Sequence, residues 1–504
     1  MTHCFYITTP IYYVNDAPHI GHAYTTLACD TLARYKRLAG YKVKFLTGTD
    51  EHGQKVEKAA SQAGSPPQKF VDRVSQTFRD LLPLLEAVPD DFIRTTEPRH
   101  IKAVQFIWQE LVKRDQIYLG EYSGWYAVRD EAFYSEAELV NGKAPTGAEV
   151  EWVTEPSYFF RLSCWQDKLL EFYHKNPSFI APDSRRNEVI RFVEGGLTDL
   201  SVSRTSFKWG VPVPGDPQHV VYVWLDALTN YITALGYPNQ LADFQSYWPQ
   251  AVHVVGKDIL RFHAVYWPAF LMAADLPLPR QVFAHGWWTN EGVKISKSLG
   301  NTIDPVTLTQ TFGADALRYF LLREVSFGQD GDFSGQNLIN RYNSDLANAY
   351  GNLVQRVLSF IAKNCQGRVP QPDTFQNHDV TLQQAASSVL VDLDTDLQTL
   401  AFHKYADHIW QVISKANQYI DEQKPWVLKT VDVGRMQTIL YTLAETIRKI
   451  AILTQPLLPT ASTAILNQLS VPKDQRSFSS LDQSLKPGTV LPEPVAVFPR
   501  YVKE

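Results

Sequence analysis

Cysteine is scarce in this chain. Its 504 residues include four cysteines, Cys4, Cys29, Cys164 and Cys365, and no two of them form a C-x-x-C pair. A cysteine zinc knuckle is therefore excluded, and cysteines so far apart in sequence do not support a disulfide framework. We expect a reduced, cytoplasmic protein.

Long apolar runs and a strong excess of one charge are also missing. No run of about 18 apolar residues is free of charged side chains, so no membrane span is predicted. The first strand-like stretch begins at Cys4, which leaves no room for a signal or transit peptide and favours bacterial cytoplasm. The net charge of -5 neither supports nor forbids a nucleic-acid partner, because local patches decide such binding. The 44% hydrophobic content suffices for several cores.

The amino-terminal segment has the pattern of a βαβ unit. A short apolar stretch, CFYITT, precedes a Pro-containing loop; helical spacing then runs from His22 to Leu38, and KVKFLTG reads as a second strand. This order predicts a Rossmann-like parallel sheet that binds its ligand at the carboxyl ends of the strands. The sequence HIGH, from His19 to His22, lies where such folds bind phosphate.

HIGH by itself is a weak signal, because four residues of common types occur together by chance. Its chemistry still suits a nucleotide. Gly21 has no side chain, so a purine ring or a phosphate can lie against the backbone. The imidazoles of His19 and His22 can donate hydrogen bonds to phosphoryl oxygens as charge develops.

A second motif, KISKS, runs from Lys294 to Ser298. In isolation it is more typical of a solvated basic loop. Its alternative is a clamp in which Lys294 and Lys297 close over a triphosphate and neutralise its charge. HIGH after the first strand and KISKS after a late strand form a far more specific pair than either motif alone.

The composition and the periodicity of the sequence change at several points. Gly- and aromatic-rich strand and turn patterns begin near residue 115 and indicate an inserted module, whereas long helical stripes dominate the last third of the chain. We predict five segments. They are the first half of the α/β domain at 1–114, the inserted module at 115–211, the second half at 212–285, the KISKS loop and a linking region at 286–344, and a helical domain at 345–504.

Taken together, these motifs resemble those of the class I aminoacyl-tRNA synthetases, and within that class the methionyl-tRNA synthetase family. Ile295 stands where the second motif usually has methionine. The resemblance implies an α/β Rossmann-like parallel-sheet catalytic domain with an inserted connective module, followed by an all-α anticodon-binding helical bundle. The segments that carry it are PIYYVNDAPHIGHAYTT, FLTGTDEHG, YVWLDALTNY, GKDILRFHAVYWPA, HGWWTNEGVKISKSLGN, NAYGNLVQRV and QKPW.

The resemblance implies an activity and a role for individual residues. L-Methionine and ATP, with Mg²⁺, would form methionyl-adenylate, and the acyl group would pass to tRNA(Met), both initiator and elongator. His19 and His22 would stabilise the reacting phosphate, and Lys294 and Lys297 the departing pyrophosphate. The ATP site would comprise His19, Gly21, His22, Gly256, Asp258, Lys294, Ser296, Lys297 and Ser298. The methionine site would comprise Ile11, Tyr13, Asp50, Trp224, Ala227, Tyr231, His263 and Trp267.

The residue types agree with these roles. A thioether is polarisable and packs well against aromatic edges, and a carboxylate such as Asp50 pairs with an α-ammonium group. Any one aromatic residue alone would be ordinary core, but four tryptophans near the two motifs indicate a lined cavity. Asp258 suits ribose hydroxyls, although it could instead cap the helix that follows it. The four tryptophans are Trp224, Trp267, Trp287 and Trp288.

In the helical part, Asn352, Arg356 and Trp426 match the family's anticodon-reading positions. Asn352 and Arg356 are four residues apart, so they share a helix face and can address base edges together. Trp426 can stack on an unpaired base. Without the resemblance, a surface ion pair for Arg356 and helix packing for Trp426 would be preferred.

The length and the cysteine content of the inserted module limit which amino acid the enzyme could select. About a hundred residues are too few for the editing domains of the leucine, isoleucine and valine enzymes. Many methionyl enzymes carry cysteine zinc knuckles here, but this segment has only Cys164, so we expect no structural zinc and assign no residue of the chain as a metal ligand. The lack of a cysteine zinc site also argues against the alternative that the chain is a cysteinyl-tRNA synthetase, because that family selects its thiol substrate with a bound zinc. No carboxyl-terminal dimerisation module follows the helical region, which favours a monomer.

Two other functions remain open at this point. A small-molecule adenylyl- or cytidylyltransferase shares the Rossmann-like core and an H-x-G-H motif, but it does not need the long helical carboxyl-terminal part. A non-catalytic tRNA-binding module derived from a synthetase has no physical reason to keep both HIGH and KISKS.

Overall fold

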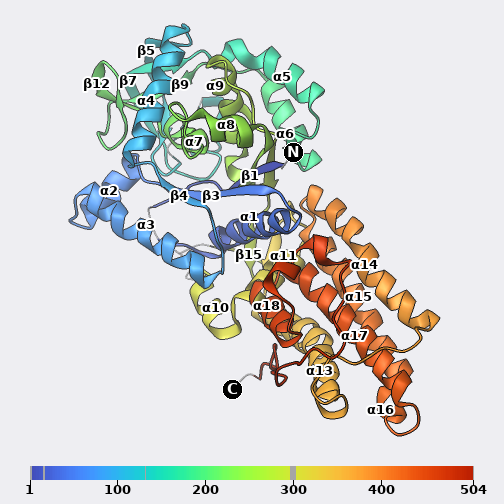
Figure 1. Ribbon diagram of the computed structural model, residues 1–504. Helices are drawn as coiled ribbons and strands as arrows, with labels where there is room; N and C mark the ends of the chain where they lie inside the picture. The colour runs from blue at the N-terminus through green and yellow to red at the C-terminus, as the bar shows by residue number, and fades with distance from the viewer. Residues whose placement is uncertain (1–2, 15–16, 131, 135, 296–301, 503–504) are drawn as a thin grey trace.

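The computed structural model describes residues 3–14, 17–130, 132–134, 136–295 and 302–502. An α/β region fills the upper half of Figure 1, and a helical region extends from it to the lower right. The fold class predicted from the sequence is confirmed, because a parallel sheet is followed by a bundle of long helices. No helix within these ranges is long and apolar enough to cross a membrane.

One parallel sheet organises the α/β region. β1 (Cys4–Thr8) lies between β3 (Lys42–Asp50) and β13 (Ala251–Gly256), in parallel register with both. The run of buried residues along these strands is expected where helices cover both faces of a sheet. The other strands are β2 (Tyr12–Tyr13) and β4 (Asp91–Arg94), which pair with β3, and β14 (Gln281–His285) and β8 (Ile180–Ala181), which follow β13.

The carboxyl ends of the strands meet at one edge of the sheet. β3 ends there at Asp50, β13 at Gly256 and β14 at His285. Helix α1 (Ile20–Leu38) begins at the same edge and confirms the helix predicted after HIGH. An edge of this kind is where open α/β sheets bind their ligands.

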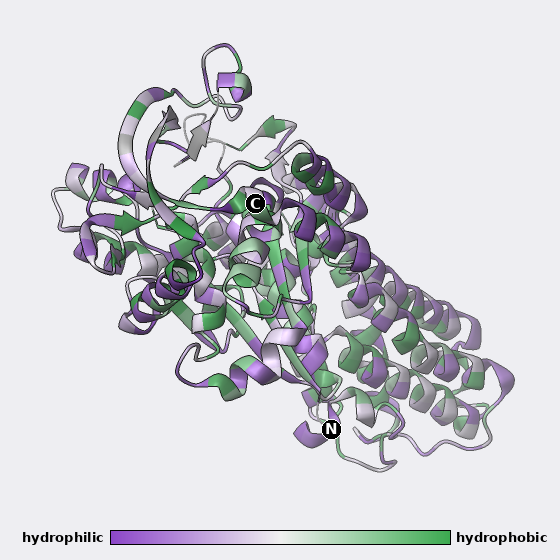
Figure 2. Cartoon of the chain, turned by 90° about the horizontal axis from the view of Figure 1, so that it is seen from above, coloured by the Kyte–Doolittle hydropathy of each residue, from purple (hydrophilic) through white to green (hydrophobic). Residues whose placement is uncertain are grey.

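Residues 115–211 contain a second, antiparallel sheet and two helices, and the long hairpin of this sheet curves away from the body in Figure 2. The same segment supplies β8 to the parallel sheet, so it is not confined to the hairpin. Its elements are β5 (Ile117–Ala127), β6 (Ala132–Tyr134), β7 (Glu151–Phe160), α5 (Gln166–Lys175), α6 (Asp183–Glu194), β9 (Leu200–Ser201) and β10 (Ser203–Arg204).

Further helices and short strands surround the parallel sheet and lead to the bundle. Those of the α/β region are α2 (Gln54–Gln62), α3 (Pro67–Leu84), α4 (Pro98–Lys113), β11 (Pro212–Val213), β12 (Asp216–Val221), α7 (Val223–Thr233), α8 (Leu241–Tyr247) and α9 (Trp267–Ala273). Those of the linking region are β15 (Trp288–Asn290), β16 (Val293–Lys294), α10 (Pro305–Phe312), α11 (Ala314–Arg323), β17 (Gly331–Phe333) and α12 (Gly335–Arg341).

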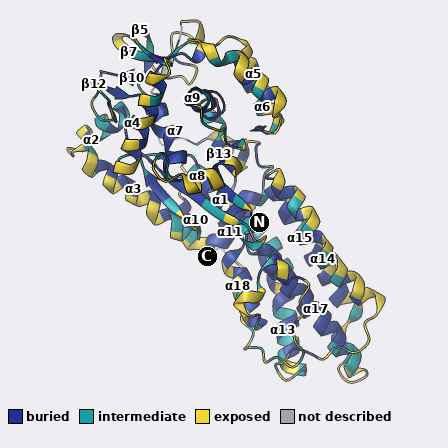
Figure 3. Ribbon diagram, turned by 45° about the horizontal axis from the view of Figure 1, so that its top comes forward, coloured by how far each residue is buried: buried dark blue, intermediate teal, exposed yellow. Residues whose placement is uncertain are grey.

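The helical region packs its long helices side by side, with apolar faces inward and polar faces outward (Figures 2 and 3). Its core is continuous with that of the α/β region: Leu27 of α1, Leu317 of α11 and Leu443 of α17 (Val433–Thr454) belong to one cluster of buried apolar residues. Its helices are α13 (Asn352–Asn364), α14 (Asn377–Gln398), α15 (Phe402–Gln423), α16 (Pro425–Leu428), α17 (Val433–Thr454) and α18 (Pro459–Gln468).

Candidate active site

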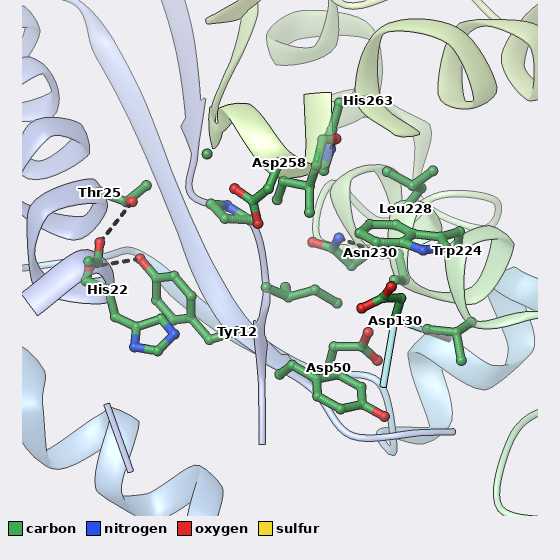
Figure 4. Close-up of a pocket in the computed structure, with 18 of the residues that line it drawn as sticks. Tyr12, His22, Thr25, Asp50, Asp130, Trp224, Leu228, Asn230, Asp258 and His263 are labelled. Carbon is green, nitrogen blue, oxygen red and sulfur yellow. Dashed lines mark hydrogen bonds between the residues drawn. The ribbon is translucent and has the colours of Figure 1, made fainter. Parts of the chain in front are cut away.

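A cavity of about 450 Å³ opens at the carboxyl edge of the parallel sheet. Figure 4 shows Tyr12 and His22 on one side of it and Trp224 and Asn230 of α7 on the other. Most of the residues predicted for ATP and methionine meet here. Those that line the cavity are Ile11, Tyr13, His19, Gly21, His22, Asp50, Trp224, Ala227, Tyr231, Gly256, Asp258 and His263.

Two of the four tryptophans lie away from the cavity surface. Trp267 is fully buried, and its ring centroid lies 6.4 Å from that of Tyr231, which does line the cavity. Trp288 packs in the core against Tyr24. Trp224 and Trp287 line the cavity as expected from the sequence. Trp267 therefore supports the pocket wall instead of forming its surface.

The KISKS motif is only partly within the described residues. The backbone of Lys294 ends β16, whereas Ser296, Lys297 and Ser298 lie outside the described ranges. The chain after the motif returns to HIGH, because the carbonyl of Ile303 accepts the N–H of Ile20 at 3.3 Å. The chain shortly after the KISKS motif thus contacts the start of the helix that follows HIGH.

The HIGH histidines cap α1 reciprocally. The N–H of Gly21 donates to Nδ1 of His19 at 3.1 Å, and the N–H of His19 donates to Nδ1 of His22 at 3.0 Å. An Nδ1 that accepts a hydrogen bond does not carry the proton, so each neutral ring bears it on Nε2. Both rings can therefore donate from Nε2 at a helix start that already favours anions.

Gly21 is required by the position of His19. A Cβ atom on Gly21 would lie 2.9 Å from Cε1 and 3.1 Å from Nδ1 of the His19 ring. Any side chain there would displace the ring and its capping hydrogen bond.

Aromatic rings and a buried histidine form the wall at α7. Trp224 stacks on Phe262 with ring centroids 3.7 Å apart. Nδ1 of His263 donates to the carbonyl of Ile259 at 2.9 Å, so Nε2 accepts the hydroxyl of Tyr231 at 2.7 Å. Burial lowers the pKa of His263 to about 4 and keeps the ring neutral near pH 7. Such a wall suits an apolar, polarisable side chain.

Asp258 faces the cavity from the turn after β13. Its Oδ1 accepts the indole N–H of Trp287 at 3.1 Å, and a Cβ on Gly256 would lie 2.5 Å from the same oxygen. The absence of a side chain at Gly256 therefore leaves room for this carboxylate. Its hydrogen bond to Trp287, and not to a helix start, sets aside the capping alternative.

Several cavity residues were not predicted from the sequence. His285 accepts the Thr25 hydroxyl at 2.7 Å, a contact between residues 260 positions apart. Arg129 and Asp130 reach the cavity from the inserted segment, and Asn230 reaches it from α7. Asn230 lies three residues after Ala227, so helical spacing could have found it. His285 is the last residue of β14, at the edge of the sheet where ligands bind. Arg129 and Asp130 carry no local signal.

The predicted anticodon residues lie together in the helical region. Arg356 of α13 pairs with Asp421 at 2.7 Å, and its guanidinium lies 5.9 Å from the centre of the Trp426 ring. Trp426 is 39% exposed at α16, at the far end of the bundle from the cavity (Figure 1). Asn352, one turn before Arg356, is exposed. The ion pair foreseen as an alternative for Arg356 therefore exists, and Trp426 still presents a face to solvent.

Known proteins match the chain over its length. The family described as class I (M) tRNA synthetases matches residues 5–152 and 137–358, and the anticodon-binding domain of methionyl-tRNA ligase matches residues 369–504. Methionine–tRNA ligase of Rickettsia bellii is 57% identical and covers 99% of this chain and 100% of its own. The chain belongs to the methionyl-tRNA synthetase family. The family resemblance inferred from the motifs is confirmed.

Other members of the methionyl-tRNA synthetase family agree. Methionine–tRNA ligase of Brucella suis is 53% identical over 99% of this chain and 98% of its own. A solved structure of Mycobacterium tuberculosis methionyl-tRNA synthetase in complex with methionyl-adenylate has a TM-score of 0.97 at 50% identity, and covers 99% of this chain and 100% of its own. The fold of this family member is thus that of an aminoacyl-tRNA synthetase throughout.

Proposed function

We propose that this chain ligates L-methionine to tRNA in two ATP-dependent steps. The observation that carries the proposal is one cavity in which the HIGH helix start, Asp50 and the aromatic wall of α7 converge. The relative of known structure carries methionyl-adenylate, a molecule with a phosphate and a methionyl part. The cavity offers a suitable surface to each of those parts.

In the first step, a carboxylate oxygen of methionine forms a bond to the α-phosphorus of ATP. The bond from that phosphorus to the bridging oxygen breaks, and pyrophosphate leaves. His19 and His22 donate hydrogen bonds from Nε2 to the phosphoryl oxygens as the negative charge on these oxygens grows. The methionine carboxylate is itself the nucleophile, so the step requires no nucleophile from the protein. In the second step, a hydroxyl of the terminal ribose of tRNA attacks the acyl carbon, and AMP leaves.

Methionine would be held at both ends. Asp50 accepts its ammonium group, a contact that every amino acid shares. The side chain lies among Ile11, Tyr13, Trp224, Ala227, Tyr231 and His263, with Trp267 behind them. Because His263 is neutral, the thioether meets no buried charge at this ring.

ATP would extend from the HIGH helix start to the end of β13. Gly256 and Asp258 would face the ribose and the adenine, and Gly21 would let the nucleotide approach the backbone. Lys294, Ser296, Lys297 and Ser298 would bind the phosphates and the departing pyrophosphate. Mg²⁺ would enter on the phosphate oxygens of ATP and offset their charge. Among the described residues, no group of three or more His, Cys, Asp or Glu side chains could hold a metal.

Asn352, Arg356 and Trp426 would read the anticodon of tRNA(Met), initiator and elongator alike. The segments 1–114 and 212–285 would form the catalytic domain, 115–211 the connective module, 286–344 the stem-contact region and 345–504 the anticodon-binding domain. We propose a monomer of the bacterial cytoplasm.

Pyrophosphate exchange into ATP tests the first step, with each amino acid offered separately and no tRNA present. Exchange with methionine alone is expected. Exchange with another amino acid would retain the class and overturn the methionine pocket. Exchange with none would overturn the proposed function.

A further inference from the structure

A buried carboxylate lies directly behind the cavity. Asp226 of α7 has no solvent exposure and is not among the cavity-lining residues. Nδ1 of His52 lies 2.6 Å from one of its oxygens, and Nε2 of His100 lies 2.7 Å from the other. His52 and His100 are themselves 4% and 0% exposed. Three ionisable side chains are thus enclosed together.

The carboxylate is charged. Burial by itself would raise the pKa of Asp226, but the two imidazoles, His52 first, outweigh that effect and hold it at about 2. A buried carboxylate accepts hydrogen bonds only, so each ring must present an N–H to it. The rings are therefore fixed in orientation as well as in distance.

The hydrogen bonds join the two ends of the methionine site. His52 follows Asp50 by two residues, in the turn after β3. Asp226 stands on α7 between Trp224 and Ala227, which line the cavity. The hydrogen bond from His52 to Asp226 thus links the end of β3, which carries the proposed ammonium acceptor Asp50, to the helix that carries the proposed side-chain pocket.

Other contacts hold both partners in place. The indole N–H of Trp209 donates to the carbonyl of Glu51 at 2.6 Å, and its ring lies edge-on to that of His52 at 5.5 Å. On the other side, His100 ties Asp226 to α4, a helix that packs against α7. The link is therefore held from two sides, by Trp209 next to His52 and by His100 of α4 next to Asp226.

We propose that Asp226, acting through His52, is a positioning residue that sets the distance between the ammonium site at Asp50 and the side-chain pocket on α7. This inference rests on the proposed function, because it takes methionine as the occupant. Its consequence is specific: loss of the link displaces Asp50 relative to Trp224 and Ala227, and leaves the ATP site at the HIGH helix untouched.

The histidines provide matched pairs of variants. His52 donates from Nδ1, whose position an asparagine amide can reproduce, whereas a glutamine amide reaches the Nε2 position. His100 donates from Nε2, so at this position a glutamine amide can reproduce the donor and an asparagine amide cannot. His52→Asn and His100→Gln should therefore keep the KM for methionine near that of the wild type. His52→Gln and His100→Asn should raise it.

The experiment measures pyrophosphate exchange with methionine and ATP varied in turn, on the full chain. Asp226→Asn should raise the KM for methionine about tenfold or more and change the KM for ATP less than about twofold, because small misplacements in a site have large kinetic effects. Asp379→Asn is the matched control. Asp379 is a carboxylate with no side-chain exposure that accepts from Arg435 and Tyr419, far away in the helical region.

Equal rises of the two KM values in Asp226→Asn, or a KM for methionine that stays unchanged, would overturn the inference. If Asp226→Asn does not fold, the two His52 variants provide the test. Equal KM values for methionine in His52→Asn and His52→Gln would then overturn the inference. A wild-type chain without methionine-dependent exchange would instead overturn the proposed function, and this inference with it.

Discussion

Arg318 and Asp30 form an ion pair of 2.8 Å in which neither side chain has any solvent exposure. Asp30 belongs to α1, the helix that begins with HIGH, and Arg318 belongs to α11. The same guanidinium donates to the carbonyls of Pro456 and Leu457, in the connection between α17 and α18. One side chain therefore joins the HIGH helix to the anticodon-binding region.

Arg318→Met should lower the free energy of unfolding by about 3 kcal/mol, because the buried Asp30 loses this buried cation and keeps the partly exposed Arg34, at 2.7 Å, as an ion-pair partner. Denaturant unfolding followed by circular dichroism measures the change. Arg37→Met is the control: Arg37 is on the same helix and pairs with Asp90 at 2.6 Å, but both side chains are about a third or more exposed. Arg37→Met should lower the free energy of unfolding by less than about 1 kcal/mol. Equal losses would contradict the role of burial.

Asp315 gives the same junction a pH dependence. Burial, with Glu86 nearby, raises its pKa to about 7 against the hydrogen bond from the N–H of Ala461 and the charge of Arg318. The folded state therefore binds this proton more tightly than the unfolded chain. Protonated Asp315 therefore adds to the free energy of unfolding. This contribution is fully present below about pH 4, and it is lost as the pH rises through 7, a total of about 4 kcal/mol.

Asp315→Asn removes this titration. The Tm of the wild type should fall relative to that of the variant between pH 5 and pH 8, when both are measured by differential scanning calorimetry. A difference in Tm that stays constant across this range would contradict a raised pKa at Asp315.

Gly21→Ala should slow pyrophosphate exchange about 100-fold or more, because the new Cβ displaces the His19 ring from the position at the phosphate that we propose for it. The KM for methionine should change little, since the proposed side-chain pocket is on α7. Gly335→Ala is the control, because a Cβ there meets no atom within 4 Å. A Gly21→Ala variant with wild-type exchange would show that the position of His19 does not matter for the reaction.

Trp426→Ala tests the proposed anticodon contact. Stacking of a base on an aromatic ring contributes about 1–3 kcal/mol, so kcat/KM for tRNA should fall about 5- to 150-fold. Pyrophosphate exchange, which needs no tRNA, should stay unchanged. Phe375→Ala alters an aromatic residue of similar exposure, 40% against 39%, in the same region. Equal losses in both variants would argue against a specific stacking role.

Local patterns were enough for much of the fold. The stretch CFYITT, the helix after HIGH and the strand KVKFLTG were all predicted where β1, α1 and β3 occur. The family was also recognisable, because HIGH, KISKS and the segments around them occur in a fixed order. Such features depend on neighbours in sequence, so periodicity and motif spacing reveal them.

Tertiary structure decided which of these residues share a surface. It placed Trp267 behind the cavity wall and brought Arg129 and Asp130 to the cavity from the inserted segment. It also joined His52 to Asp226 across 174 positions and Arg318 to Asp30 across 288. Contacts between charges so far apart leave no periodic signal, because they arise only when separate elements pack together. The sequence therefore determined the elements and the chemistry, and packing determined which side chains act as one site.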